Sequence, residues 1–386
     1  MLRRKLNPTA ARFLLLTMLC CFASNGCKAE PWALWEQYAN KYVDPQGRVI
    51  DKQAGDRSTS EGEAYAMFFA LVANDRPRFD KVLKWTEENL AGGDMTARLP
   101  AWNWGKTADG TWKVLDANSA SDADLWMSYT LIQAGTMWKE PRYTNMGKFM
   151  AKRIAQVEVV NINNVGPVLL PGPSGFHPDD NTWTLNPSYE PLPLIQQMAT
   201  LDPGGPWAQM VQALPHFLAS AAVGGFEMDW VQYNNSSGWK PVPLPGQSTN
   251  PAAVGSYDAV RVYLWTGMAD KATPQQPACM DALAGMTRYL KNALLPPGRV
   301  DEHGMVADAD GSSGFSAALV PFLISAGEQK QADDQMERVK ATRDSTTGLF
   351  GHDQNYYDQN LALFGLGWNE QRFHFEKDGR LKVKWK

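Results

Sequence analysis

Apolar residues recur at every third or fourth position through most of the chain, which is the spacing of one buried helix face. Glycine, proline and small polar residues interrupt this pattern at intervals and predict where the helices end. The predicted helices cover residues 31–43, 62–74, 77–91, 122–138, 141–158, 188–201, 205–221, 255–269, 276–293, 314–326, 328–342 and 356–368. We therefore expect an all-α protein with about twelve helices.

Two segments depart from the helical pattern. Residues 159–170 and 226–243 are richer in β-branched residues, aromatic residues and turn formers, which favours short hairpins. Because both lie between predicted helices, we expect them to be loop decorations and not parts of a central sheet.

Acidic residues follow a capping serine at several predicted helix starts, where the side-chain oxygen and the negative charge satisfy unpaired backbone amides. Glu61 follows Ser60, and Asp122 follows Ser121. Comparable positions recur at intervals of 43 to 69 residues, roughly one helix pair each: Glu61, Asp122, Tyr189, Asp258, Gly314 and Tyr357. Six helix pairs predict a closed α/α toroid. Its inner helices would run in one direction and bring distant acids to one face.

The first 29 residues have the form of a signal peptide. Basic residues precede the apolar stretch 13–23, which is too short to span a bilayer as a permanent helix. These basic residues are Arg3, Arg4, Lys5 and Arg12. Cleavage after Ala29 predicts a periplasmic or secreted protein without stable membrane insertion, and it leaves open whether Cys27 is lipidated.

Removal of residues 1–29 takes away five basic residues and no acidic residue, so the net charge changes from −4 to −9. An acidic chain argues against nucleic acid or an anionic membrane as a partner. Of the four cysteines only Cys279 would remain, which excludes an intrachain disulfide. Because no linker or low-complexity tract divides the rest, we predict a single domain over residues 30–386.

Aromatic residues are abundant, with 15 Trp, 12 Tyr and 15 Phe. Several tryptophans, among them Trp102, Trp104 and Trp183, lie in loop-like sequence. Aromatic rings stack on the flat apolar faces of pyranose sugars, so this clustering indicates a carbohydrate-binding cleft. Burial in the core is the alternative for each tryptophan taken singly.

Several motifs, in order along the chain, resemble glycoside hydrolase family 8. They are Ser60-Glu61-Gly62 with Tyr65, Arg98-Leu99-Pro100-Ala101-Trp102, Ala120-Ser121-Asp122-Ala123-Asp124, Asn186-Pro187-Ser188-Tyr189, Tyr257-Asp258-Ala259 with Arg261, Gly314-Phe315-Ser316-Ala317-Ala318, and Tyr356-Tyr357. Within the family, the resemblance is closest to the periplasmic endoglucanases encoded with bacterial cellulose synthases. It implies an (α/α)6 barrel, hydrolysis of β-1,4-glucan with inversion, and no metal or organic cofactor.

The same resemblance implies roles for three carboxyl groups. Glu61 matches the general acid, Asp258 matches the general base, and Asp122 matches a residue that binds and distorts the sugar at the cleavage point. Two of them have a purely structural alternative: Glu61 as a first-turn acid, and Asp258 as the partner of Arg261 in an intrahelical salt bridge. Asp124 is expected to be structural.

A further set of residues is expected to contact the substrate: Trp102, Trp104, Trp126, Trp183, Tyr189, Arg261 and Tyr357. Tyr189 resembles the family's tyrosine beside the catalytic water, with packing on a loop as its alternative. A metal site has no support, because the five histidines are scattered and no pair of them has helical ligand spacing.

The resemblance therefore predicts an exported endo-β-1,4-glucanase that accompanies cellulose synthesis and export, with β-1,4-glucan as its partner. Association with the cellulose synthase complex stays open. A same-family hydrolase of chitosan, xylan or mixed-linkage glucan is the alternative within enzymes, and a net charge of −9 would attract cationic chitosan. A non-catalytic periplasmic glucan-binding component is the alternative outside enzymes.

Overall fold

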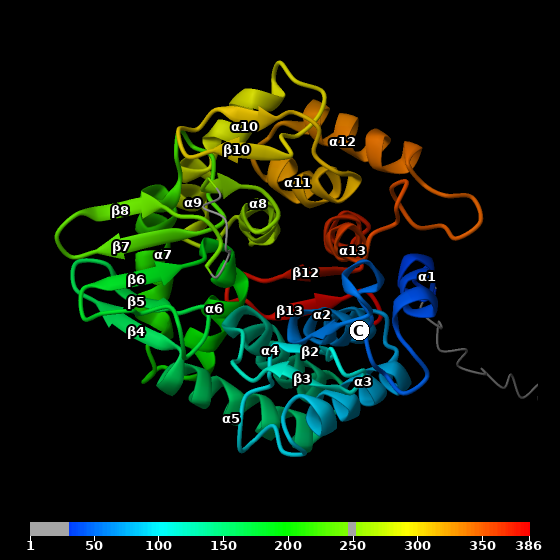
Figure 1. The fold of residues 1–386 in the computed structure, drawn as a ribbon. Coiled ribbons are helices and arrows are strands. Elements are labelled where there is room, and N and C mark those ends of the chain that lie inside the picture. The colour runs from blue at the N-terminus through cyan, green and yellow to red at the C-terminus, as the bar shows by residue number, and fades with distance from the viewer. Residues whose placement is uncertain (1–30, 246–251) are drawn as a thin grey trace, which may run out of the picture. The chain divides into compact units, whose positions relative to one another are not determined.

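Six helices, buried on nearly all sides, form a ring in the computed structural model, which describes residues 31–245 and 252–386 (Figure 1). They are α2 (Ser60–Val72), α4 (Ser121–Met137), α6 (Leu192–Leu201), α8 (Ala259–Met268), α11 (Ser313–Ser325) and α13 (Tyr356–Asn369). Several are apolar around most of their circumference, as expected for helices covered on every side. The predicted signal peptide and Cys27 lie outside the described residues.

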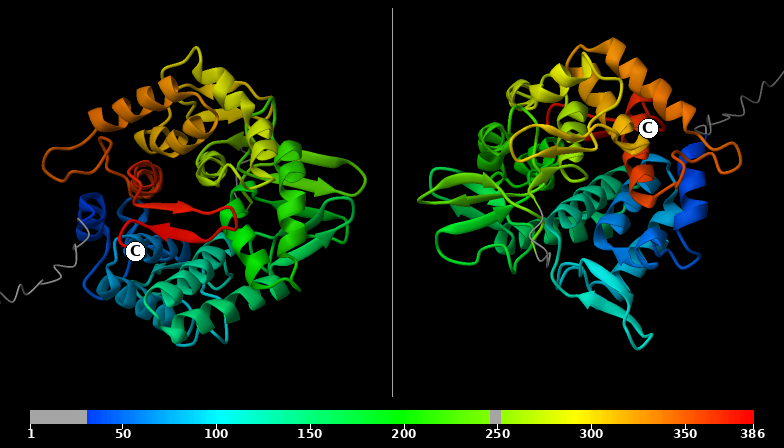
Figure 2. Two further views of the ribbon diagram at one scale, coloured as in Figure 1. Left: turned by 180° about the vertical axis from the view of Figure 1, so that it is seen from behind. Right: turned by 45° about the horizontal axis from the view of Figure 1, so that its top comes forward.

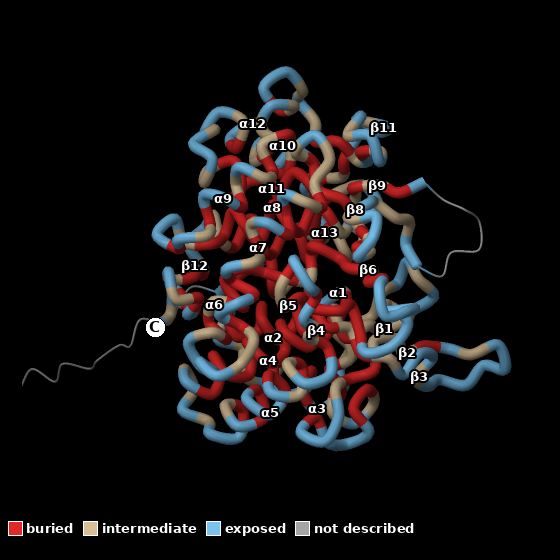
Figure 3. The backbone as a smooth tube through the Cα atoms, turned by 90° about the vertical axis from the view of Figure 1, so that its left-hand side faces the viewer, coloured by how far each residue is buried: buried red, intermediate tan, exposed pale blue. Residues whose placement is uncertain are grey.

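A second layer of helices surrounds the ring. It consists of α1 (Ala33–Tyr42), α3 (Arg76–Asn89), α5 (Pro141–Val157), α7 (Trp207–Ala221), α9 (Gln276–Ala282), α10 (Ala284–Leu290) and α12 (Gln329–Ala341). These helices are amphipathic; α12, for example, buries only Ala332, Gln335 and Val339. Buried backbone accordingly lies inside and exposed backbone on the rim (Figure 3). Inner and outer helices alternate along the chain, which confirms the predicted (α/α)6 barrel.

The predicted helices are present, with differences at some ends. The segment predicted over 188–201 begins as a 3₁₀ turn, and α6 starts only at Leu192. Pro191 explains this, because the residue before a proline avoids the helical conformation. The segment predicted over 276–293 is divided at Leu283 into α9 and α10. Helix α8 starts later than predicted, because strand β9 precedes it.

Short antiparallel strands decorate the ring, and in the described part of the chain they form five small sheets. They are β1 (Ser58–Thr59), β2 (Asn103–Lys106) and β3 (Trp112–Asp116); β4 (Val159–Ile162) and β5 (Gly166–Leu169); β6 (Thr182–Leu185), β7 (Val231–Asn234) and β8 (Gly238–Pro241); β9 (Val254–Gly255), β10 (Arg299–Asp301) and β11 (Val306–Asp308); and β12 (Phe373–Phe375) and β13 (Leu381–Val383). The two predicted hairpins are confirmed as β4–β5 and β7–β8. The other strands were not predicted.

The β12–β13 hairpin covers the end of the ring at which the inner helices finish (Figure 2, left). Tyr129 of α4 donates a hydrogen bond from its hydroxyl to the Gly379 carbonyl at 2.7 Å. Just beyond the hairpin, Trp385 Nε1 donates to the carbonyl of Leu71, in the last turn of α2, at 3.1 Å. The hairpin therefore closes the C-terminal end of the ring and leaves the N-terminal ends of the inner helices at the opposite face.

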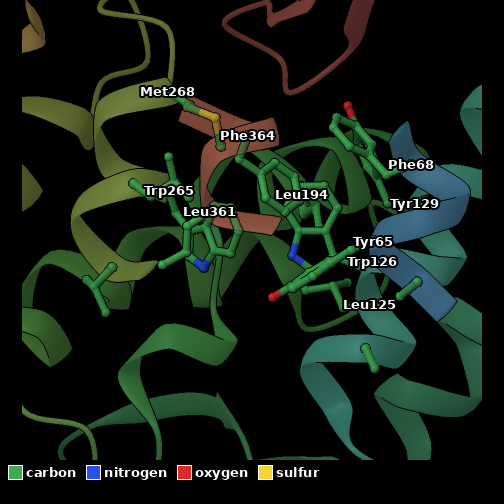
Figure 4. Packing of buried hydrophobic residues seen from close by; sticks show 14 of the residues in the cluster. Tyr65, Phe68, Leu125, Trp126, Tyr129, Leu194, Trp265, Met268, Leu361 and Phe364 are labelled. Atoms are coloured by element: carbon green, nitrogen blue, oxygen red, sulfur yellow. The ribbon is translucent and has the colours of Figure 1, made fainter. Parts of the chain in front are cut away.

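Aromatic rings join the last inner helix to the others and close the ring (Figure 4). The ring centroid of Phe364, on α13, lies 4.6 Å from that of Phe69 on α2. It also lies 5.0 Å from Trp126 on α4 and 5.0 Å from Trp265 on α8. Each such aromatic pair adds about 0.5–1.5 kcal/mol beyond the burial of its area. Phe364 is therefore the point at which one side chain holds four inner helices together.

Phe364→Ala should lower the free energy of unfolding by about 3–5 kcal/mol, because it removes a fully buried ring and leaves a cavity. Urea denaturation followed by circular dichroism measures this change. Phe149→Ala is the matched control, since Phe149 on α5 is 57% exposed, and its effect should stay within about 0.5 kcal/mol. Equal effects of the two substitutions would contradict the role assigned to Phe364.

Candidate functional site

The N-terminal ends of three inner helices carry the acids that the sequence singled out. Glu61 lies in the first turn of α2, whose start is fixed by Thr59, because the Thr59 hydroxyl accepts a hydrogen bond from the Gly62 amide at 3.2 Å. Asp122 has the corresponding position in α4, and Asp258 directly precedes α8. Each carboxylate is thus placed by a helix start at the open face of the ring.

Arg261, in the first turn of α8, binds all three carboxylates. Its Nη1 contacts Oε2 of Glu61 and donates to Oδ2 of Asp122 at 3.0 Å. Its Nη2 donates to Oδ1 of Asp258 at 2.7 Å. The Arg261 side chain is only 2% exposed, so water screens these ion pairs weakly. The predicted convergence of distant acids is therefore confirmed, and the arginine predicted to pair with Asp258 is its centre.

Two hydroxyl groups complete the hydrogen bonding of the guanidinium. Nη1 of Arg261 donates to the hydroxyl of Tyr65 at 3.0 Å, and Nη2 donates to Oγ of Ser188 at 2.8 Å. Ser188 is itself held in place, because its carbonyl accepts a hydrogen bond from Trp265 Nε1 at 3.0 Å. Ser188 was missed as a site residue, although it lies directly before a predicted tyrosine.

Burial raises the pKa of Glu61 to about 7. The charges of Asp122 and Asp258 act in the same direction, whereas Arg261 opposes them. Burial also raises the pKa of Asp122, again against the effect of Arg261. One guanidinium does not balance three carboxylates, so the cluster retains a proton up to near-neutral pH, and Glu61 is a group that can carry it.

Two of the predicted tyrosines lie at this cluster. The guanidinium carbon of Arg261 is 5.7 Å from the ring centroid of Tyr189. Tyr357, at the start of α13, donates from its hydroxyl to the carbonyl of Tyr257 at 2.7 Å. Tyr257 directly precedes Asp258 in the chain. The 3₁₀ turn Pro187–Tyr189 and the last inner helix therefore both contribute to the site.

A cleft adjoins the cluster at Asp258 and Tyr189. One part is a cavity of about 620 Å³, and Asp258 is in its wall. A second part, of about 320 Å³, has Trp102 and Tyr189 in its wall. Trp230 and Leu244 line both parts, so the two cavities adjoin. The walls contain aromatic, aliphatic and acidic side chains, a combination that can bind a polyhydroxylated ligand with apolar faces.

The β2–β3 hairpin projects from the main body (Figure 3). It carries further aromatic side chains. Trp104 on β2 and Trp112 on β3 are stacked, with ring centroids 5.0 Å apart. The guanidinium of Arg48 lies 4.6 Å from the centroid of Trp104. The predicted contact residue Trp104 thus packs against Trp112 and Arg48, whereas Trp102, two positions earlier in the chain, lies in the cleft wall.

The structure places two predicted contact residues away from the cleft. Trp126 is 1% exposed and lies in the aromatic core with Phe364, so its predicted contact with substrate is wrong. Trp183 lies on β6, where it stacks on His177 at a centroid distance of 4.9 Å and lines neither cavity. In both cases the local sequence did not reveal the direction in which the ring points.

Two residues of the cleft wall were not predicted as site residues. Trp230 lines both cavities and packs edge-on against Tyr189, with centroids 6.1 Å apart. The signal that could have identified it was its position among aromatic residues in loop-like sequence. Asp229 lines the larger cavity together with Asp258, and no helix-start pattern marks it. It was missed because its partners are distant in sequence.

A second acid pair lies buried behind the cluster. Burial, together with the charge of Glu158, raises the pKa of Asp124. Burial raises the pKa of Glu158 to about 7, and Ser119 donates a hydrogen bond to its Oε1 at 2.6 Å. This buried position accords with the structural role expected for Asp124. Within the described ranges, no group of three or more His, Cys, Asp or Glu residues is arranged to hold a metal ion.

Comparison with known proteins gives similarities along nearly the whole chain. The model of the glycosyl hydrolases family 8 matches residues 7–371. The endoglucanase of Escherichia coli O157:H7 is 41% identical over 372 residues, which cover 96% of each protein, and that of Salmonella typhi is 43% identical over 365 residues, 94% of each. The solved endo-1,4-D-glucanase from Vibrio fischeri ES114 is 35% identical, with a TM-score of 0.80 over 92% of this chain and 99% of that one.

The raised pKa of Glu61 predicts how stability changes with pH. Because its pKa is about 7 in the folded protein and about 4.5 as the ordinary value, the folded state binds more protons between these limits. The contribution of this group to the free energy of unfolding therefore falls as the pH rises from about 5 to about 7. Glu61→Gln should make that fall shallower, as measured by urea unfolding across this range.

The control is Glu337→Gln, at an exposed position of α12, which should keep the wild-type slope. A slope in Glu61→Gln as steep as that of the wild type would contradict the raised pKa.

Proposed function

The chain belongs to the glycosyl hydrolases family 8, an inverting family of glycoside hydrolases, and we propose that it is an endo-β-1,4-glucanase that cuts cellulose chains internally. The observation that carries this proposal is the convergence of Glu61, Asp122 and Asp258 on Arg261 beside an aromatic cleft. The endoglucanases of Escherichia coli and Salmonella, with 41% and 43% identity, support the substrate class.

In this proposal Glu61 is the general acid. Its pKa of about 7, raised by burial, keeps a proton available near neutral pH. The side chain is 22% exposed, so a ligand in the cleft can reach it. Glu61 donates its proton to the glycosidic oxygen as the bond between that oxygen and the anomeric carbon breaks.

Asp258 is the general base. Arg261 holds its Oδ1 at 2.7 Å, and the carboxylate lines the larger cavity, where it can take a proton from water. That water attacks the anomeric carbon from the side opposite the leaving oxygen, so the configuration inverts. Inverting enzymes keep the two carboxyl groups about 6.5–9.5 Å apart to admit this water. Glu61 and Asp258 bind different terminal nitrogens of Arg261, so the two carboxyl groups do not contact the same atom of the guanidinium.

Asp122 binds and distorts the sugar at the cleavage point. Its side chain is 4% exposed and is fixed both by Arg261 and by the Ala123 amide, which donates to its Oδ1 at 2.7 Å. Trp102, Tyr189 and neighbouring aromatic residues of the cleft stack on the flat faces of the flanking glucose units. An enclosed pocket would accept only a chain end; here two adjoining cavities, one with Asp258 in its wall, form a longer cleft, which supports attack within the chain.

We further propose that the protein acts in the periplasm or as a secreted enzyme, on cellulose made and exported by the same cell. Basic residues followed by the apolar stretch 13–23 support this location.

Cleavage of the peptide would leave a net charge of −9. This charge favours cationic chitosan as the alternative substrate.

Glu61→Gln and Asp258→Asn should each lower kcat on cello-oligosaccharides by at least about 10³-fold, because each removes a proton transfer while its amide keeps the shape of the side chain. Binding of the same oligosaccharides, measured by calorimetry, should persist. NMR of the first products of the wild type should give the α-anomer. Activity that survives in Glu61→Gln would refute the assignment of the acid, and the β-anomer as first product would refute inversion.

We expect the substrate to be a glucan, as the endoglucanase relatives suggest, and not the cationic chitosan that the net charge favours. Wild-type kcat/KM should be higher on cello-oligosaccharides than on chito- or xylo-oligosaccharides of equal length, because uncharged glucose units stack on the aromatic walls. The rate of product formation at low and high salt shows whether charge attracts the substrate, because salt screens that attraction. Turnover of chito-oligosaccharides alone, weakening with salt, would identify a chitosanase, and binding without any turnover would identify a glucan-binding protein.

A further inference from the structure

Asp229 holds the chain segment that carries Asp258. Its Oδ1 accepts hydrogen bonds from three backbone amides: Ser256 at 2.7 Å, Asp258 at 3.1 Å and Ala259 at 2.7 Å. Asp229 lies between α7 and β7, 29 residues before Asp258. A carboxylate from another part of the chain therefore caps the start of α8.

Helix α8 has no cap of its own. Asp258 has the N-cap position, yet its side chain makes no capping hydrogen bond and binds Arg261 at 2.7 Å instead. An aspartate at this position ordinarily accepts hydrogen bonds from the first amides of its own helix. The amides that an N-cap side chain binds, here those of Val260 and Arg261, donate instead to the carbonyls of Ser256 and Asp258, both at 3.0 Å. Asp229 binds the amides just before them, so the start of α8 is satisfied without the Asp258 side chain, and that carboxylate is free to face Arg261 and the cavity.

The segment around Asp229 is itself anchored. The Asp229 amide donates to the carbonyl of Val254, on β9, at 2.8 Å. The amide of Glu227 donates to the hydroxyl of Tyr263, on α8, at 2.9 Å. Asp229 is therefore fixed to the strand before the Asp258 segment and to the helix after it, so its Oδ1 has a defined position.

We propose that Asp229 is a positioning residue for the general base: by binding the amides of Ser256, Asp258 and Ala259, it fixes the backbone at the start of α8 and leaves the Asp258 carboxylate directed at the cavity. This inference rests on the role proposed for Asp258. Asp229 and Asp258 line the same cavity. Burial, with the charge of Asp258, raises the pKa of Asp229 to about 7, so a neutral Asp229 that still accepts hydrogen bonds through a carbonyl oxygen is compatible with this role.

The test compares three substitutions. Asp229→Ala removes the acceptor, Asp229→Asn keeps an acceptor oxygen without the charge, and Asp229→Glu keeps the charge but moves the oxygen by one methylene. On cello-oligosaccharides, kcat should fall about 10–100-fold in Asp229→Ala and Asp229→Glu with little change in KM, because the base is misplaced. Asp229→Asn should stay within about threefold of the wild type.

Asp75→Ala is the matched control for the loss of a cap. Oδ1 of Asp75 accepts from the Arg78 amide at 3.2 Å at the start of the outer helix α3. This variant should lose thermal stability but keep kcat. The proposal is overturned if Asp229→Ala keeps wild-type kcat, or if Asp229→Asn loses as much as Asp229→Ala, since the charge and not the cap would then matter.

Hydrogen exchange separates this inference from the enzyme assignment. The amides of residues 256–259 should exchange faster in Asp229→Ala and at the wild-type rate in Asp229→Asn, whether or not any glucan is cleaved. If Asp229→Ala does not fold, Asp229→Glu against Asp229→Asn gives the same comparison. Unchanged exchange in both Asp229→Ala and Asp229→Glu would overturn the proposal; a wild type that cleaves no glucan would overturn only the proposed function.

Discussion

The buried guanidinium of Arg261 is the interaction on which the site depends. It binds Glu61, Asp122 and Asp258 from three helices, and its side chain is almost completely removed from water. A buried charge is tolerated only when it is paired and hydrogen-bonded, and removal of one partner typically costs about 3–5 kcal/mol. Arg261 has such partners on both terminal nitrogens. The inner helices must therefore present their starts to the same face for this cation to be satisfied.

The direction of the inner helices also determines the chemistry. Helix starts carry partial positive charge, which favours carboxylates there. Burial acts in the opposite sense and raises the pKa of Glu61, as does the charge of its acidic neighbours. The result is a crowded set of carboxyl groups in which helix ends and Arg261 balance part of the charge and one proton balances the rest. An acid and a base can thus coexist a short distance apart at one pH.

Helical periodicity was sufficient to predict the ring, and the acids at helix starts were sufficient to predict Glu61, Asp122 and Asp258 as neighbours. The direction of individual rings could not be predicted: Trp126 in its predicted helix and Trp230 in its predicted hairpin are both aromatic candidates, and only packing sends one into the core and the other into the cleft. The strands outside the two predicted hairpins, of two to five residues, escaped detection, since tertiary pairing and not local pattern creates them. Asp229 escaped because a cap supplied from 29 residues away leaves no local signal.

Closure of the ring by its last helix has a consequence for how the site forms during folding. Arg261 and Glu61 are separated by 200 residues, and Tyr357 reaches the carbonyl of Tyr257 across 100. Contacts between such distant positions form late, after the loss of chain entropy has been compensated elsewhere. A refolding chain would regain helical structure well before these groups meet. Recovery of activity would therefore lag recovery of helicity. Enzymatic turnover would measure when α13 packs against the other inner helices, not when those helices form.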